Sequence, residues 1–215
     1  MLNHRNTYLK IIAECNFARP RVSNKQIIHF ANVSPATVTE MTRSLERAGL
    51  VNRRRYTGVT LTAAGEQLAC QLLHHYRLCE TFLVKKLHLP LTAVPDQAWS
   101  MAAELTGETA LALNHYLGEP QRSPFGGSLS PDQILNDQPI TRLSAVPAAT
   151  TVVLTSYLES TALVDYLQHL ALPFGVPLHV TKVDTGLNLL YLEDAQHQAF
   201  TLNDQAADYI YTKKA

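Results

Sequence analysis

The chain of 215 residues lacks the features that mark a membrane protein or a disulfide-stabilised one. No apolar run approaches the roughly 20 residues that a membrane-spanning helix needs, and the opening MLNHRNTYLK contains no signal-peptide core. The three cysteines, Cys15, Cys70 and Cys79, are widely spaced and form no CxxC pair. This spacing disfavours both a disulfide framework and a structural zinc site. We therefore expect a cytoplasmic protein with reduced cysteines and no membrane partner.

Catalytic and nucleotide-binding patterns are missing as well. The nine histidines show no HxH or HExxH spacing, and the chain has no glycine-rich phosphate loop. No Ser/His/Asp or Cys/His order typical of a nucleophilic site stands out. The sequence therefore predicts that the protein is not an enzyme. Its 46% hydrophobic and 17% charged residues are typical of a globular chain with one large or two small domains.

The formal net charge of zero conceals two parts of opposite charge. Residues 1–72 contain ten Lys or Arg and four acidic residues, a net of +6. The remainder contains eight basic and fourteen acidic residues, a net of −6. A basic part of this kind is typical of proteins that bind the phosphate backbone of a nucleic acid duplex.

Residues 22–65 have the pattern of a winged helix-turn-helix. Ser23 can cap a first helix, and Ser34 can cap a second one that ends at Gly49. A short hairpin follows, with three arginines near its tip: Arg53, Arg54 and Arg55. In such a motif the second helix enters the major groove of DNA. The polar face of this helix offers Thr37, Thr39, Glu40 and Arg43 for contacts with the duplex.

Apolar periodicity predicts further helices on both sides of this motif. We expect them over residues 3–16, from a cap at Thr62 to about residue 87, near 94–105 and near 107–117. An apolar helical layer that follows a small winged domain most often forms a dimer interface. Two copies of the chain would then bind a two-fold related operator.

The last third of the chain changes in character. Residues 119–147 are rich in Pro, Gly, Ser and Asp, which predicts a linker. Short β-type runs follow at 151–157, 176–183, 187–192 and 199–202, with a helix near 159–171. This pattern is typical of a small SH3-like barrel. The predicted fold is mainly α with a small β domain: a winged domain at 1–62, a helical dimerisation domain at 63–118, the linker, and the barrel at 148–215.

Four segments of the chain occur together in the order and spacing of one bacterial family. They are VSPATVTEMTRSLERAGLV, HYRLCETFL, RSPFGG and the tail from Leu172 through TLNDQAADYI. Together they resemble the diphtheria-toxin-repressor type of metal-dependent repressor, over nearly the whole chain. The resemblance implies a homodimer that binds a double-stranded DNA operator and has an SH3-like, FeoA-like C-terminal domain. It also implies Fe(II) or Mn(II) between the first helix and the dimerisation helices, where the metal switches on repression of metal-uptake genes.

The resemblance also assigns the contacts with DNA. The positions where the family's recognition helix meets DNA fall on Ser34, Ala36, Thr37, Thr39 and Glu40. Glu40 stands where Gln or Lys is usual, and a carboxylate can accept a hydrogen bond only from cytosine N4, so the operator is expected to differ from the usual one. The alternative is a solvated Glu40. Arg53, Arg54 and Arg55 are expected to contact phosphates, and Tyr56 to pack within the wing.

The family's metal positions, by contrast, fall on residues that are poor ligands. These positions are Thr7, Lys10, Tyr76, Trp99, Ala102 and Ala103, and Pro95 occupies a further one. Glu80 alone remains as a good ligand, whereas Mn(II) and Fe(II) need several carboxylate and imidazole donors together. We therefore predict that the standard metal switch is lost. Trp99 is expected to fill the former cavity, and Lys10, paired with Glu80, to tie down the first helix.

Three alternatives stay open. A relocated metal site could use His75, Cys79 and Glu80, since the first two lie one helical turn apart, although a core cysteine beside a surface histidine is the commoner explanation. The barrel could instead bind a Pro-rich peptide, with the winged domain serving protein contacts. A pocket between the helical layer and the barrel could bind a small molecule. No cofactor is certain from the sequence, and Mn or Fe is implied by the family resemblance alone.

Overall fold

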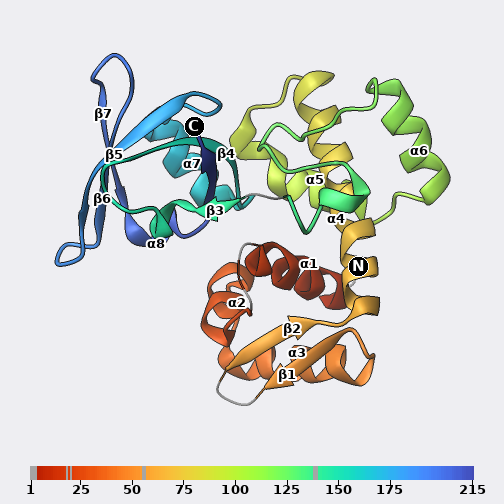
Figure 1. Ribbon diagram of the computed structural model, residues 1–215. Coiled ribbons are helices and arrows are strands. Elements are labelled where there is room, and N and C mark those ends of the chain that lie inside the picture. The colour runs from red at the N-terminus through yellow and green to blue at the C-terminus, as the bar shows by residue number, and fades with distance from the viewer. Residues whose placement is uncertain (1–3, 18, 20, 55–56, 138–139) are drawn as a thin grey trace. The chain divides into compact units, whose positions relative to one another are not determined.

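The computed structural model describes residues 4–215 except 18, 20, 55–56 and 138–139 (Figure 1). The chain divides into two compact units. The first comprises Met1–Pro124 and Ser128–Asn136, and the second comprises Phe125–Gly127 and Asp137–Ala215. Among the described residues, none of the helices combines the length and the hydrophobicity needed to cross a bilayer.

Three helices begin the first unit, and local sequence signals set their ends. They are α1 (His4–Asn16), α2 (Asn24–Ala31) and α3 (Pro35–Arg47). Ser23 accepts a hydrogen bond from the Gln26 backbone N–H while the Gln26 side chain accepts one from Ser23, which makes a capping box at the start of α2. Ser34 caps α3 and Pro35 takes its first position. The predicted caps of both helices are confirmed.

The wing is an antiparallel hairpin of β1 (Val51–Arg54) and β2 (Gly58–Leu61). An isolated antiparallel bridge pairs Val22, just before α2, with Val59 of β2. Gly58 is required at this contact, because a Cβ atom there would lie 2.2 Å from the carbonyl oxygen of Val22. Its φ of +111° is also strained for any other residue. The hairpin is therefore fastened to the start of α2 through the backbone.

The long helix α4 (Ala63–Lys85) begins at Thr62, whose side chain accepts from the Gly65 backbone N–H. The Thr62 hydroxyl also donates to the carbonyl oxygen of Gly49, at the end of α3. Gly65 lies so close to the preceding backbone that a Cβ atom would stand 1.9 Å from the oxygen of Leu50. These contacts fix the first turn of α4 against the region where α3 passes into β1.

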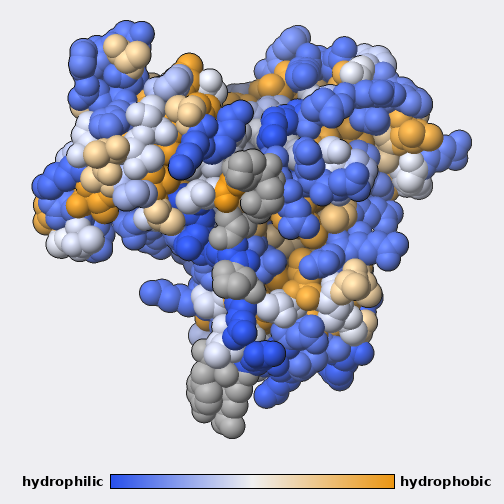
Figure 2. Space-filling model, viewed as in Figure 1, coloured by the Kyte–Doolittle hydropathy of each residue, from blue (hydrophilic) through white to orange (hydrophobic). Residues whose placement is uncertain are grey.

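Two shorter helices follow α4: α5 (Val94–Ala102) and α6 (Gly107–Tyr116). A 3-10 turn, η1 (Leu91–Ala93), comes directly before α5. The predicted helix near 94–105 is three residues shorter, because Ala103 and Glu104 instead form a turn before the cap of α6 at Thr106. Several large apolar side chains are exposed here: Leu87 at 53%, Leu111 at 59% and Tyr116 at 63%. Figure 2 shows apolar residues at the surface over α6.

The segment 119–147, predicted as a linker, contains ordered and buried chain. It holds the 3-10 turns η2 (Pro131–Gln133) and η3 (Leu143–Ala145) and the short strand β3 (Thr141–Arg142). The buried guanidinium of Arg77 on α4 donates to the carbonyl oxygens of Ser128 (2.8 Å) and Ile134 (3.4 Å). The boundary between the two compact units falls within this segment. The turn-rich composition of this segment therefore reflects irregular backbone that forms part of both compact units.

The second unit is a six-stranded antiparallel sheet in the order β3-β8-β4-β5-β6-β7. Its further elements are β4 (Thr150–Tyr157), α7 (Thr161–Leu170), β5 (Pro177–Asp184), β6 (Leu189–Glu193), β7 (Ala199–Asn203), α8 (Asp204–Ala207) and β8 (Ile210–Lys214). Buried and exposed residues alternate along β6 and β7, as one buried sheet face requires. The predicted fold class, mainly α with a small β domain, is confirmed. Sequence analysis missed β3, β8 and α8.

Candidate DNA interface and the cluster around Lys10

One face of α3 is open to solvent along its whole length. Ala36, Glu40, Arg43 and Arg47 are exposed, and their spacing of three and four residues puts them on one stripe of the helix. Val38, Thr42 and Leu45 are buried on the opposite side. The helix therefore presents a polar stripe with two arginines to solvent. Sequence analysis missed Arg47, which the helical repeat from Arg43 could have indicated.

The hydroxyl groups at the start of α3 already take part in local hydrogen bonds. The hydroxyls of Ser34 and Thr37 lie 2.9 Å apart, and Ser34 accepts from the Thr37 backbone N–H. The Thr39 hydroxyl donates to the carbonyl oxygen of Pro35 at 2.9 Å. These bonds hold the side chains in fixed positions, and the Thr39 oxygen, whose hydroxyl donates, keeps its lone pairs for an outside donor.

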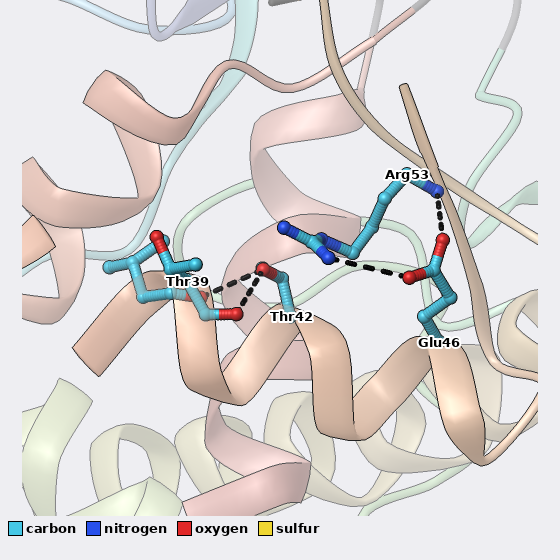
Figure 3. Close-up of polar contacts among 5 residues, drawn as sticks. Thr39, Thr42, Glu46 and Arg53 are labelled. Carbon is cyan, nitrogen blue, oxygen red and sulfur yellow. Dashed lines mark hydrogen bonds and ion pairs between the residues drawn. The ribbon is translucent and has the colours of Figure 1, made fainter. Parts of the chain in front are cut away.

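Arg53 ties the wing to α3 through Glu46. Its backbone N–H donates to Glu46 Oε1 at 3.3 Å, and its guanidinium lies 3.4 Å from Glu46 Oε2 (Figure 3). The Arg53 side chain is 24% exposed, so its charge stays within reach of a partner. Arg54 is exposed. Arg55 and Tyr56 lie outside the described residues. Sequence analysis assigned no role to Glu46, although it lies one turn beyond Arg43 on α3.

The wing and α3 share a hollow of about 660 Å³ with the start of α2. Three of the predicted phosphate- or base-contacting residues, Arg43, Arg53 and Arg54, lie around it. Its other lining residues are Ser23, Asn24, Glu46, Thr57, Gly58 and Val59. The structure thus brings the predicted arginines together around one open surface, with a single acid among them.

A second polar cluster lies where α1 packs against α4 and α5. The ammonium group of Lys10 is 2.7 Å from Glu14 Oε1, 3.9 Å from the centre of the Tyr76 ring and 5.4 Å from the Trp99 ring. Lys10 is only 7% exposed and Glu14 only 6%. The Trp99 indole N–H donates to the Thr7 hydroxyl at 3.2 Å, and the Tyr76 and Trp99 rings meet edge to face, 5.9 Å apart.

This cluster comprises four of the six residues at the family's metal positions, Thr7, Lys10, Tyr76 and Trp99. Ala102 and Ala103 take the other two, and methyl groups offer no lone pair. An ammonium group repels a metal dication, and the Trp99 indole N–H is a donor only. These residues do not fit Mn(II) or Fe(II). Trp99 is half-buried, and its ring faces Lys10. The acid that contacts Lys10 is Glu14. The expected pairing of Lys10 with Glu80 stays a prediction.

His75, Cys79 and Glu80 lie on α4, and all three are buried. Burial lowers the pKa of the His75 ring, and burial together with the Glu80 charge raises the pKa of the Cys79 thiol to about 12. The thiol therefore keeps its proton at neutral pH, whereas a metal ligand must lose it. In the part of the chain that the structure describes, no three His, Cys, Asp or Glu side chains are grouped so as to hold a metal ion. The geometry adds no support for a relocated site.

Comparison with known proteins places these features in a family. The profile of the iron dependent repressor, metal binding and dimerisation domain matches residues 62–129, and the MarR family profile matches residues 10–58. An HTH-type transcriptional regulator of Methanocaldococcus jannaschii, MJ0568, is 30% identical over 96 residues, which are 45% of this chain and 77% of that protein. The chain belongs to the family of iron- and manganese-dependent repressors.

Other members of the repressor family extend the likeness. The iron-dependent repressor IdeR of Mycobacterium tuberculosis is 28% identical over 127 residues, 55% of each chain, so this chain spans about half the length of that relative. The structure of the manganese regulator SloR superposes with a TM-score of 0.85 and 26% identity, covering 98% of both chains. The relatives are transcriptional regulators and not enzymes, which agrees with the predicted function.

Proposed function

We propose that the protein is a repressor that binds a double-stranded DNA operator through α3 and the β1–β2 wing. The observation that carries the proposal is the placement of Arg43, from the exposed α3 stripe, and of the wing residues Arg53 and Arg54 around one open hollow. An exposed helix stripe with two arginines and a basic wing on the same surface match the two contact regions that a winged helix-turn-helix uses on a duplex. The net charge of +6 over residues 1–72 supports the same partner.

Each part of this surface has its own role in the proposal. Arg53 and Arg54 contact phosphates beside the groove, and Glu46 holds Arg53 in position for its contact. Ser34, Thr37 and Thr39, together with Ala36, Glu40 and Arg43, face the bases and flanking phosphates from the first turns of α3. Arg55 is proposed as a further phosphate contact from its place in the sequence alone.

The operator is bound by two copies of the chain. The exposed apolar side chains of Leu87, Leu111 and Tyr116 lie in the region that matches the profile of a dimerisation domain. Their exposure would be costly in a monomer, because each large apolar side chain gains about 1.5–3 kcal/mol on full burial. We propose that the same surface of a second copy covers them. By analogy with its relatives, the protein would act in the cytoplasm on genes of iron or manganese homeostasis.

Selection from a pool of duplexes tests the proposal directly. The pool carries a randomised core of about 30 base pairs, long enough for two half-sites one or two helical turns apart. The expected result is an enriched sequence with two-fold symmetry. Its affinity should fall by about 10³-fold or more between roughly 50 and 200 mM salt, as phosphate contacts require. Recovery of no preferred duplex, or affinity that ignores salt, would favour the peptide-binding or small-molecule alternatives.

A further inference from the structure

The buried charge at Lys10 is unusual because it joins three helices that are distant in the sequence. Lys10 and Glu14 come from α1, Tyr76 from α4 and Trp99 from α5. A lysine is almost never fully buried unless it is paired. Here the ammonium has a carboxylate at 2.7 Å and the face of an aromatic ring at 3.9 Å. The surroundings of Lys10 are therefore built to hold one positive charge.

The carboxylate and the aromatic rings around Lys10 have different roles. Glu14 is on the same helix as Lys10, so their ion pair alone fastens nothing to α4 or α5. The rings of Tyr76 and Trp99 belong to those two helices and attract the cation through their π faces. The Trp99 indole adds a hydrogen bond to Thr7 of α1. A single cation thus draws α1 towards both neighbouring helices.

We propose that the Lys10 ammonium is a built-in cation that replaces the divalent metal of this family and holds the DNA-binding form without metal. α1 is the point of action, because it packs against α2, α3 and α4 within the same unit. The lysine brings its own charge, whereas a metal ion must be supplied from solution. The inference rests on the proposed function, and it goes further by making DNA binding independent of Mn(II) and Fe(II).

The charge balance around Lys10 excludes simple coexistence with a metal ion. One carboxylate, Glu14, contacts the ammonium and neutralises it. A dication at the same place would meet a fixed positive charge within a few ångströms, in a buried setting where such repulsion is strong. The two aromatic rings that face Lys10 cannot coordinate Mn(II) or Fe(II) as carboxylates do.

Two readouts test the inference, and one of them needs no DNA. Trp99 is the single tryptophan of the chain and contacts the Lys10 cluster, so its fluorescence reports on this site alone. Titration of the full-length protein with Mn(II), with Zn(II), or with Fe(II) without oxygen is expected to leave the emission unchanged. Lys10→Met is expected to change it. Lys182→Met is the matched control and should leave the emission as it was, because it removes an exposed cation that likewise has an acid, Asp184, at 2.7 Å and a ring, Tyr191, at 5.4 Å.

The second readout is affinity for the selected duplex in EDTA and with each metal. Wild type is expected to bind equally in all of these conditions. The double variant Lys10→Met with Glu14→Gln, which removes both charges of the ion pair, is expected to bind at least about tenfold more weakly, a coupling typical of allosteric sites. Lys182→Met should bind as wild type does.

The outcomes separate this inference from the proposed function. A gain of about tenfold or more with one metal, accompanied by a change in Trp99 emission, would overturn the built-in cation and leave the repressor proposal standing. Wild-type affinity in the folded double variant would overturn it as well. Failure to select any duplex, with or without metal, would overturn both proposals.

Discussion

Charged residues do opposite things in two parts of the first unit. Around the hollow between α3 and the wing, three arginines lie on an open surface, and a single exposed acid holds one of them. Between α1, α4 and α5, one lysine is buried and every contact described for it comes from within the protein. Exposed charge of one sign is available to a partner, whereas enclosed charge with its counter-charge serves the fold. This difference is why we propose DNA binding for the first region and conformational control for the second.

The largest effect is expected at the enclosed charge. Lys10→Met removes one member of the buried ion pair with Glu14, which should lower the free energy of unfolding by about 3–5 kcal/mol. Urea denaturation followed by circular dichroism measures the change. Lys182→Met removes an exposed lysine and should stay within about 0.5 kcal/mol of wild type. Equal effects of the two variants would mean that the buried charge has no special role.

The packing of α4 against the start of the wing can be tested by substituting glycines. Gly65→Ala places a Cβ atom 1.9 Å from the Leu50 oxygen, at the contact between α4 and the start of β1. Such overpacking should cost about 1–3 kcal/mol of unfolding free energy. Gly107→Ala at the start of α6 meets no atom within 4 Å and should stabilise by about 0.4–1 kcal/mol. Thermal melts distinguish the two, and a neutral Gly65→Ala would contradict the close packing of this joint.

The sequence predicted the parts of this molecule that depend on near neighbours. Ser23, Ser34 and Thr62 are caps because their hydroxyls reach backbone groups three residues away. The pairing of Val22 with Val59 is not visible locally, since the two residues approach only after α2, α3 and β1 have formed. Strand β8 was missed because its last residues, Thr212, Lys213 and Lys214, are polar and carry no alternation of apolar residues.

The Lys10 cluster was predicted only in part, and from the family resemblance instead of from local signals. The resemblance placed Lys10, Tyr76 and Trp99 at positions that meet in the fold, and the structure brings them together. The acid that contacts Lys10 at 2.7 Å is Glu14. Its spacing of four residues along α1 could have indicated that pair. The resemblance pointed to Glu80 instead, because Glu80 falls at a metal-ligand position of the family. Such a resemblance carries no information on an ion pair within one helix.

At the exposed surface, Arg54→Ala should weaken binding of all duplexes alike. Loss of one phosphate contact lowers the slope of log affinity against log salt by about one unit for each site contacted. Filter binding at several salt concentrations measures the slope. Lys213→Ala removes an exposed cation of the second unit and serves as the control. A slope that Arg54→Ala leaves unchanged would remove the wing from the interface.

The smallest and most specific effect is expected at Glu40. Its carboxylate is exposed on the α3 stripe and can accept from cytosine N4. Glu40→Gln should relax or change the preference at one base position per half-site, worth about 1–3 kcal/mol of discrimination, with little change in the salt slope. Repeated duplex selection reads the preference. Glu66→Gln, an exposed acid in the first turn of α4, should select the wild-type sequence. Identical selections by Glu40→Gln and wild type would show that Glu40 is only a solvated residue.

The crystal structure of the protein bound to its selected duplex, grown in EDTA, tests the central claim most directly. The account predicts two copies per duplex, with the stripe from Ala36 to Arg47 in the major groove, Arg53 and Arg54 at phosphates, and the Lys10 ammonium still between Glu14 and Tyr76. A complex in which α3 faces away from the duplex would contradict the account. So would a complex that forms only after metal is added and has a metal ion beside a displaced Lys10.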